Sequence, residues 1–184
     1  MKINLNPRTN NQDGNGNETE RFIEEIIIVF KSINYGYFFC KLIGKNQKEQ
    51  KKIINKFQKY LQCRLNCNLP WCVRSNWEIE HKANYDCKDS FDLFTEICLD
   101  KINYKVIIEL DKNRADQIAK KFLSRMSHTI NDPTIYIAFC YPGTKKMSVT
   151  EAKKYFDYCL IITNKFNDLE IPKKFIGFIV ERNK

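Results

Sequence analysis

Three acidic residues, Asp92, Glu109 and Asp111, stand where two neighbouring strands would bring their side chains together. Glu109 and Asp111 are two residues apart in an apolar run, so they point to the same face of a strand. Asp92 lies in the preceding apolar run and can approach them if the two runs pair. Carboxylates gathered in this way repel each other unless a cation lies among them. A hard divalent cation such as Mg²⁺, or Mn²⁺, accepts oxygen ligands and can activate water against a phosphodiester.

The segments around these acids predict the elements that would position them. Two apolar runs, residues 90–100 and 104–111, flank the short segment 101–103 and predict a β-hairpin. An amphipathic helix over residues 113–127 follows at once, because its apolar residues recur at helical spacing. The acids would therefore lie on a hairpin, directly before a helix.

The rest of the chain predicts an α/β fold with a mixed central sheet flanked by helices. Residues 1–18 are polar and rich in Asn and Gly, which predicts a disordered tail. Thr19 is the expected N-cap of a first helix that begins at Glu20. The other expected elements are a helix over 47–62, strands over 77–81 and 134–140, a short helix over 150–156, and strands over 158–163 and 174–180.

Composition and charge narrow the class of protein. The chain has 184 residues, 43% of them hydrophobic, and 31 Lys and Arg against 22 Asp and Glu, for a net charge of +9. That balance favours nucleic acid or another polyanion as partner, although a merely soluble basic protein has the same composition. The longest apolar run, residues 26–30, is too short to span a bilayer, and no leader-like segment is visible. We therefore expect a cytoplasmic protein with reduced cysteines and no membrane partner.

The acids and the elements around them resemble the PD-(D/E)xK nuclease superfamily over residues 77–163. That pattern has an acid on one hairpin strand, matched by Asp92, and an acid-any-lysine triplet on the next, matched by Glu109 to Asp111. The resemblance implies a single domain over residues 19–184, with a restriction-endonuclease-like core and an N-terminal helical addition. It also implies a Mg²⁺-dependent (or Mn²⁺-dependent) endonuclease that hydrolyses DNA, for example of the restriction type, and it allows a homodimer.

The triplet departs from the family at Asp111, which occupies the position of the family lysine. A nuclease of this kind then needs a cationic group from outside the triplet. Lys121, on the following helix, is the preferred candidate because it shares a helix face with Gln117. Lys112 is the second candidate, although a straight strand would point it away from Asp111.

The same helix carries side chains suited to phosphate contacts. These expected DNA-binding residues are Arg114, Gln117, Lys120 and Arg125. Alternatively, these four residues belong to an ordinary solvent-exposed side of the helix. A second basic face, formed by five lysines of the 47–62 helix, is better explained by solvation than by DNA contact.

Two other functions remain open from the sequence. In the first, the fold is that of a catalytically inactive nuclease-like module that binds DNA or a protein partner, and Asp111 merely caps the following helix. In the second, zinc stabilises a binding protein through a cysteine cluster. The candidate ligands are Cys63, Cys67 and Cys72, with His81 and Cys87 downstream. Their spacing is not that of any common zinc finger.

Overall fold

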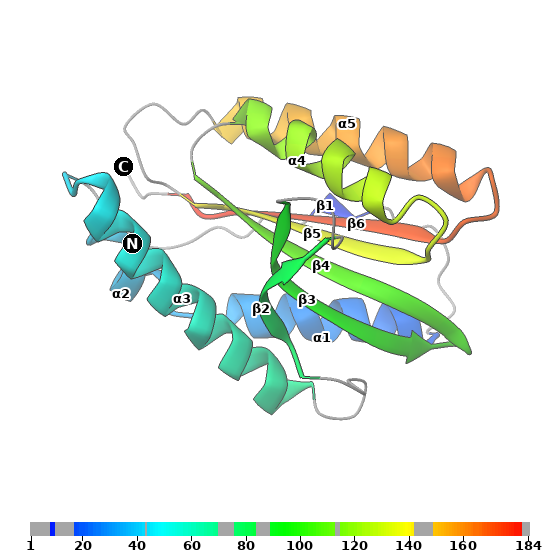
Figure 1. Cartoon of the computed structure of the whole chain (residues 1–184), viewed down its shortest axis with the longest axis horizontal. Helices are drawn as coiled ribbons and strands as arrows, with labels where there is room; N and C mark the ends of the chain where they lie inside the picture. Colours follow the sequence, from blue (N-terminus) through cyan, green and yellow to red (C-terminus); the bar gives the residue numbers. More distant parts are fainter. Residues whose placement is uncertain are drawn as a thin grey trace.

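The structure, a computed structural model, describes residues 8–9, 17–42, 44–69, 76–83, 89–112, 115–141 and 149–181. These residues form an α/β sandwich with a mixed sheet between two layers of helices (Figure 1). The strands are β1 (Arg8–Thr9), β2 (Glu78–Lys82), β3 (Ser90–Leu99), β4 (Ile102–Lys112), β5 (Thr134–Tyr141) and β6 (Lys173–Ile179). The helices are α1 (Glu18–Lys31), α2 (Tyr35–Phe39), α3 (Gln47–Asn68), α4 (Ala115–His128) and α5 (Val149–Asn167). The α/β class predicted from the sequence is confirmed.

The strands follow the order β1-β6-β5-β4-β3-β2 across one sheet. β2, β3 and β4 pair antiparallel, whereas β4, β5 and β6 pair parallel, and β1 lies antiparallel to β6 at the edge. Each parallel step needs a crossover connection, and α4 and α5 provide the two crossovers. The predicted hairpin is therefore the antiparallel half of the sheet, and it leads directly into the parallel half.

Each face of the sheet has its own hydrophobic core. Helices α1, α2 and α3 cover one face, where aromatic side chains such as Phe30, Phe57 and Phe139 pack together. Helices α4 and α5 cover the other face. Helix α5 lies so close to β6 that a Cβ atom on Gly177 would come within 2.4 Å of the Phe156 ring. Strand β5 is buried along its whole length, as expected for a central parallel strand.

The hairpin turn also fixes the start of α1. The turn is formed by Asp100 and Lys101, whose φ angles of 52° and 66° are those of the tight turns that suit a two-residue hairpin. The Asp100 carboxylate accepts hydrogen bonds from the backbone N–H groups of Glu18 and Thr19, at 3.0 and 3.1 Å. Asn17, and not Thr19, is the N-cap, and Thr19 donates its hydroxyl to Asp100 instead.

Three other predictions differ from the structure. The expected helix over 150–156 and strand over 158–163 are one continuous helix, α5, whose buried residues follow a helical period. The apolar run within it has the composition of a strand, but its packing against the sheet requires the helical spacing. Helix α3 continues to Asn68, beyond the predicted end. Arg8–Thr9, within the segment expected to be disordered, forms β1.

None of the helices in the described ranges is both long enough and apolar enough to cross a membrane.

Candidate functional site

The site lies where β3 separates from β4. The ladder between these strands runs from the pair Leu99 and Ile102 to the pair Leu93 and Ile108. At Asp92, the residue before Leu93, the side chain takes over the contact with β4. The Asp92 carboxylate accepts a hydrogen bond from the N–H of Leu110 at 2.7 Å, in the place of a main-chain carbonyl. This hydrogen bond holds the Asp92 side chain against the end of β4.

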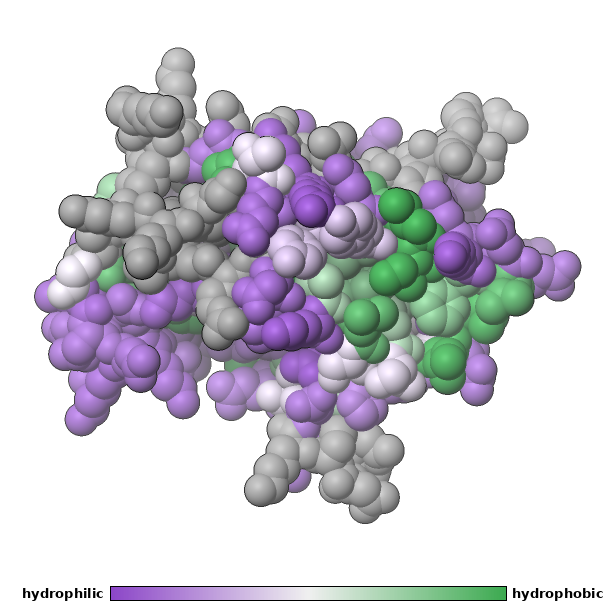
Figure 2. All heavy atoms as spheres, turned by 90° about the horizontal axis from the view of Figure 1, so that it is seen from above, coloured by the Kyte–Doolittle hydropathy of each residue, from purple (hydrophilic) through white to green (hydrophobic). Residues whose placement is uncertain are grey.

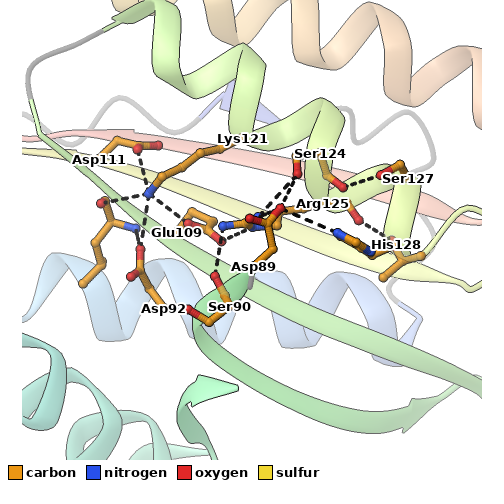
Figure 3. A network of polar contacts seen from close by, with 12 residues as sticks. Asp89, Ser90, Asp92, Glu109, Asp111, Lys121, Ser124, Arg125, Ser127 and His128 are labelled. Atoms are coloured by element: carbon orange, nitrogen blue, oxygen red, sulfur yellow. Dashed lines mark hydrogen bonds and ion pairs between the residues drawn. The ribbon is translucent and has the colours of Figure 1, made fainter. Parts of the chain in front are cut away.

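Strand alternation places the other two acids beside Asp92. Glu109 and Asp111 point to the face of the sheet that α4 covers, and their side chains are only 1% and 3% exposed. Asp92 is 32% exposed, so it forms the solvent-facing side of the group. The structure therefore brings together the three acids that the sequence singled out (Figure 3).

The cation among these acids is the ammonium group of Lys121. Its Nζ lies 2.9 Å from Glu109 Oε2, 3.0 Å from Asp111 Oδ1 and 3.5 Å from Asp92 Oδ2. Lys121 extends from the second turn of α4, and its side chain is 30% exposed. Lys121, the lysine preferred from the sequence, thus stands beside Asp111 (Figure 3).

A second cation, Arg125, holds Glu109 from the other side. Arg125 Nε donates to Glu109 Oε1 at 2.7 Å, Nη1 donates to Asp89 Oδ2 at 2.8 Å, and Nη2 donates to the Ser90 carbonyl at 2.9 Å. Asp89 also accepts a hydrogen bond from Ser124 at 2.8 Å. Arg125 therefore ties the beginning of β3 to β4 at the point where the two strands separate.

Arg125 does not lie where the sequence analysis expected it. As a DNA-binding residue it would be exposed, but it is only 8% exposed and its guanidinium points into the protein. It lies four residues after Lys121, on the same helix face. That spacing could have suggested an inward direction, whereas nothing in the sequence indicated that Asp89 would be its partner.

Burial and mutual repulsion set the electrostatics of the acids. Burial, with a contribution from the charge of Asp92, raises the pKa of Glu109 to about 7, against the attraction of Lys121 and Arg125. Burial likewise raises the pKa of Asp111. Burial opposes the charge of Lys121, but the three carboxylates outweigh it and raise its pKa, so Lys121 stays protonated. With its pKa near 7, Glu109 exchanges a proton near neutral pH.

The oxygen atoms of the site suit a hard cation. Asp111 Oδ2 is buried without a hydrogen-bond partner, and Glu109 Oε2 contacts Lys121 without a well-aligned hydrogen bond. Carboxylate oxygens are the ligands that Mg²⁺ prefers. As the acids stand, with the Lys121 ammonium between them, no group of three His, Cys, Asp or Glu side chains in the described ranges is arranged to hold a metal. A metal ion would have to take the place of that ammonium.

The other described residues proposed from the sequence form their hydrogen bonds with groups other than the three acids. Lys112 points to the opposite face of the sheet, where it contacts Gln50 of α3, so the structure does not bring it to the site. Gln117 and Lys120 both bond to Asp116, and Lys120 is 69% exposed. Arg114 lies outside the described residues.

The proposed zinc ligands are only partly described. Cys63 and Cys67 are exposed on α3, while Cys72 and Cys87 lie outside the described residues. His81 contacts Glu78 at 2.6 Å and stacks on Phe94. The described part of this cluster thus forms no zinc site.

Arg125→Met is expected to destabilise the protein by about 3 kcal/mol at pH 8, since it leaves the buried Glu109 without its hydrogen-bonded partner. Arg125→Lys is expected to recover only part of the loss, because the donors of an ammonium lie on one nitrogen and cannot reach the three acceptors that three guanidinium nitrogens contact. Urea unfolding of the three proteins measures both differences. Equal stability of the wild type and Arg125→Met would contradict the structural role of Arg125.

Comparisons with known proteins do not assign the chain to a family. The chain matches no protein-family model, no curated protein and no solved structure.

Proposed function

We propose that the protein is a Mg²⁺-dependent endonuclease that hydrolyses phosphodiester bonds in DNA. One observation carries the proposal, namely the convergence of Asp92, Glu109 and Asp111 on the ammonium of Lys121. Two adjacent strands and the following helix supply an acid, a pair of acids and a lysine. These are the components, and the order along the chain, that the resemblance to PD-(D/E)xK nucleases requires, with the lysine transferred to α4.

The residues of the site would divide the chemistry between them. Mg²⁺ held by Asp92, Glu109 and Asp111 would lower the pKa of a bound water, which could then attack phosphorus. Lys121, whose pKa the three carboxylates raise in the metal-free protein, would stabilise negative charge on the phosphate through its ammonium. Arg125 would hold the Glu109 carboxylate in place, as it does in the structure.

The exposure of the acids indicates the side from which a phosphate would approach. Asp92 and Lys121 are about one-third exposed, whereas Glu109 and Asp111 are buried behind them. A phosphate group would therefore meet Asp92 and Lys121 first. The net charge of +9 supports a polyanionic substrate.

The same geometry supports a second candidate, a catalytically inactive nuclease-like module that binds DNA or a protein partner. The specific observation is that Lys121 and Arg125 already compensate most of the charge of the three acids. A cluster compensated in this way is stable as a structural element without metal. The two candidates differ in whether the acids exchange the ammonium for a divalent cation.

Plasmid cleavage separates these candidates. We expect the wild type to nick or linearise supercoiled DNA with Mg²⁺ or Mn²⁺ and to be inactive in EDTA. Asp92→Asn should reduce the rate at least about 100-fold, because it removes a charged ligand. It should still fold, because the amide oxygen can accept the Leu110 N–H in the same way. Cleavage by Asp92→Asn at the wild-type rate, or a wild type inactive with both metals, would refute the endonuclease.

A further inference from the structure

Helix α3 has a basic face, the lysine stripe, which we define as Lys48, Lys51, Lys52, Lys56 and Lys59. All five side chains are exposed, and none forms an ion pair with a residue of the described ranges. The single acid of α3, Glu49, is already bound to Lys45 and to the helix N-terminus. The stripe therefore has unbalanced positive charge.

The lysine stripe is straight and rigid. At 100° per residue, Lys48, Lys52 and Lys59 lie within about 40° of one another, on the side of α3 opposite the buried Phe57 and Leu61. The rise of about 1.5 Å per residue separates Lys48 from Lys59 by roughly 16 Å along the axis. The result is a row of charges on a helix whose other side is anchored in the core.

The same helix packs behind the two strands of the candidate site, on the face of the sheet opposite α4. Gln50 contacts Lys112 at the end of β4, and Gln58 Nε2 donates to the Asp92 carbonyl on β3. Lys51 and Lys52 belong to the turns between these two anchors. Figure 1 shows α3 in the same layer as α1, across the sheet from α4 and α5, and Figure 2 shows hydrophilic residues crowded at the end of the molecule where α3 begins.

The charge pattern of the stripe differs from that of an ordinary solvated helix. Surfaces generally intersperse both signs, as α5 does with Glu151 and Asp157 among its lysines. The first three turns of α3 instead expose lysines with one acid, which is already paired. This repulsion between lysines is offset when they face a polyanion.

We infer that the lysine stripe, which points away from the sheet on the side that α3 covers, binds the sugar-phosphate backbone of duplex DNA. The inference rests on the proposed function and names the surface that holds its substrate. A membrane surface fits less well, since an interfacial helix needs exposed apolar anchors. Single strands bind through exposed stacking aromatics as well, and Tyr60 is partly exposed where it packs on Phe38, so a single strand is one arm of the test.

The test compares two variants with equal loss of charge. The first is Lys48→Gln/Lys52→Gln/Lys59→Gln in the stripe. The matched control is Lys101→Gln/Lys154→Gln/Lys165→Gln, at the hairpin turn and on α5, and these three lysines are also exposed. Fluorescence anisotropy with a labelled DNA duplex gives Kd at several NaCl concentrations. EDTA is present throughout, so that cleavage plays no part.

We expect the slope of log Kd against log salt concentration to be smaller by about 2 to 3 units in the stripe variant than in the wild type. Each lost phosphate contact lowers the slope by about 0.9, and the variant removes three lysines. The control should lose less than about 1 unit. Equal effects of the two variants, no effect of the stripe variant, or no duplex binding by the wild type would each overturn the inference. So would tighter binding to a single strand of the same length, or binding to phosphatidylserine vesicles in place of DNA.

The outcomes separate this inference from the endonuclease. If the stripe variant loses duplex binding but the wild type never cuts plasmid, the DNA-binding surface stands and the endonuclease fails. If the wild type cuts plasmid but the stripe variant binds as the wild type does, the surface fails alone.

Discussion

Lys121→Met is expected to lower the free energy of unfolding by about 3 to 5 kcal/mol at pH 8, because it leaves two buried carboxylates without their shared cation. The loss should become smaller at pH 5.5, where Glu109, whose pKa is raised to about 7, takes up a proton and needs less compensation. The variant should also fail to cut plasmid DNA. Urea unfolding at the two pH values measures the first effect.

The neighbouring residue provides the matched control. Lys120→Met removes the same charge one position away, but Lys120 is 69% exposed, and its partner among the described residues is Asp116. Its loss should cost less than about 1 kcal/mol. Equal destabilisation by the two substitutions would contradict the central position of Lys121.

A divalent cation should stabilise Lys121→Met and the wild type to different extents. If the acids form a metal site, Mg²⁺ or Mn²⁺ should raise the melting temperature of Lys121→Met more than that of the wild type, because the ammonium no longer competes. Absence of such stabilisation at millimolar metal would contradict the metal site and favour the inactive module.

The second large effect concerns Glu109 and pH. A carboxyl whose pKa rises from 4.5 in the unfolded chain to about 7 in the folded protein keeps its proton longer in the folded state. Between these values the folded state binds more protons, so raising the pH favours unfolding. The stability contributed by the protonated form is present below about pH 4.5 and is lost by about pH 7.

We therefore expect the stability of the wild type relative to Glu109→Gln to fall by on the order of 3 kcal/mol between these two pH values, at about 1.4 kcal/mol per unit. Above pH 7 the difference should level off. Unfolding of both proteins at half-unit intervals of pH measures it. If the stability of the wild type relative to Glu109→Gln stays constant or rises with pH, burial is not the dominant influence on the pKa of Glu109.

The sequence by itself determined several parts of the site. Alternation along β4 placed Glu109 and Asp111 on one face and Lys112 on the other, because side chains of a strand point to opposite sides in turn. Helical spacing likewise predicted α4 and the common face of Gln117 and Lys121. Such periodicities are local, so they can be read without knowing the partner elements.

The same local patterns gave wrong predictions where tertiary packing determines the structure. The second half of α5 has the composition of a strand, yet it packs as a helix, since Phe156 and Cys159 both face the sheet. Arg125 looked like a surface cation, yet it points inward, because β3 begins beside it with Asp89 and the Ser90 carbonyl. Composition does not show which groups a neighbouring element will present.

Only the tertiary structure decided that Lys121 lies among the three acids. The sequence gives its distance along α4, but its distance from Asp92 depends on where β3 leaves β4 and on how α4 crosses the sheet. These are non-local features, set by the ladder register and by core packing between residues far apart in the chain. Ion-pair energies depend strongly on separation and burial, so the charge state of the site follows from those contacts and not from residue order.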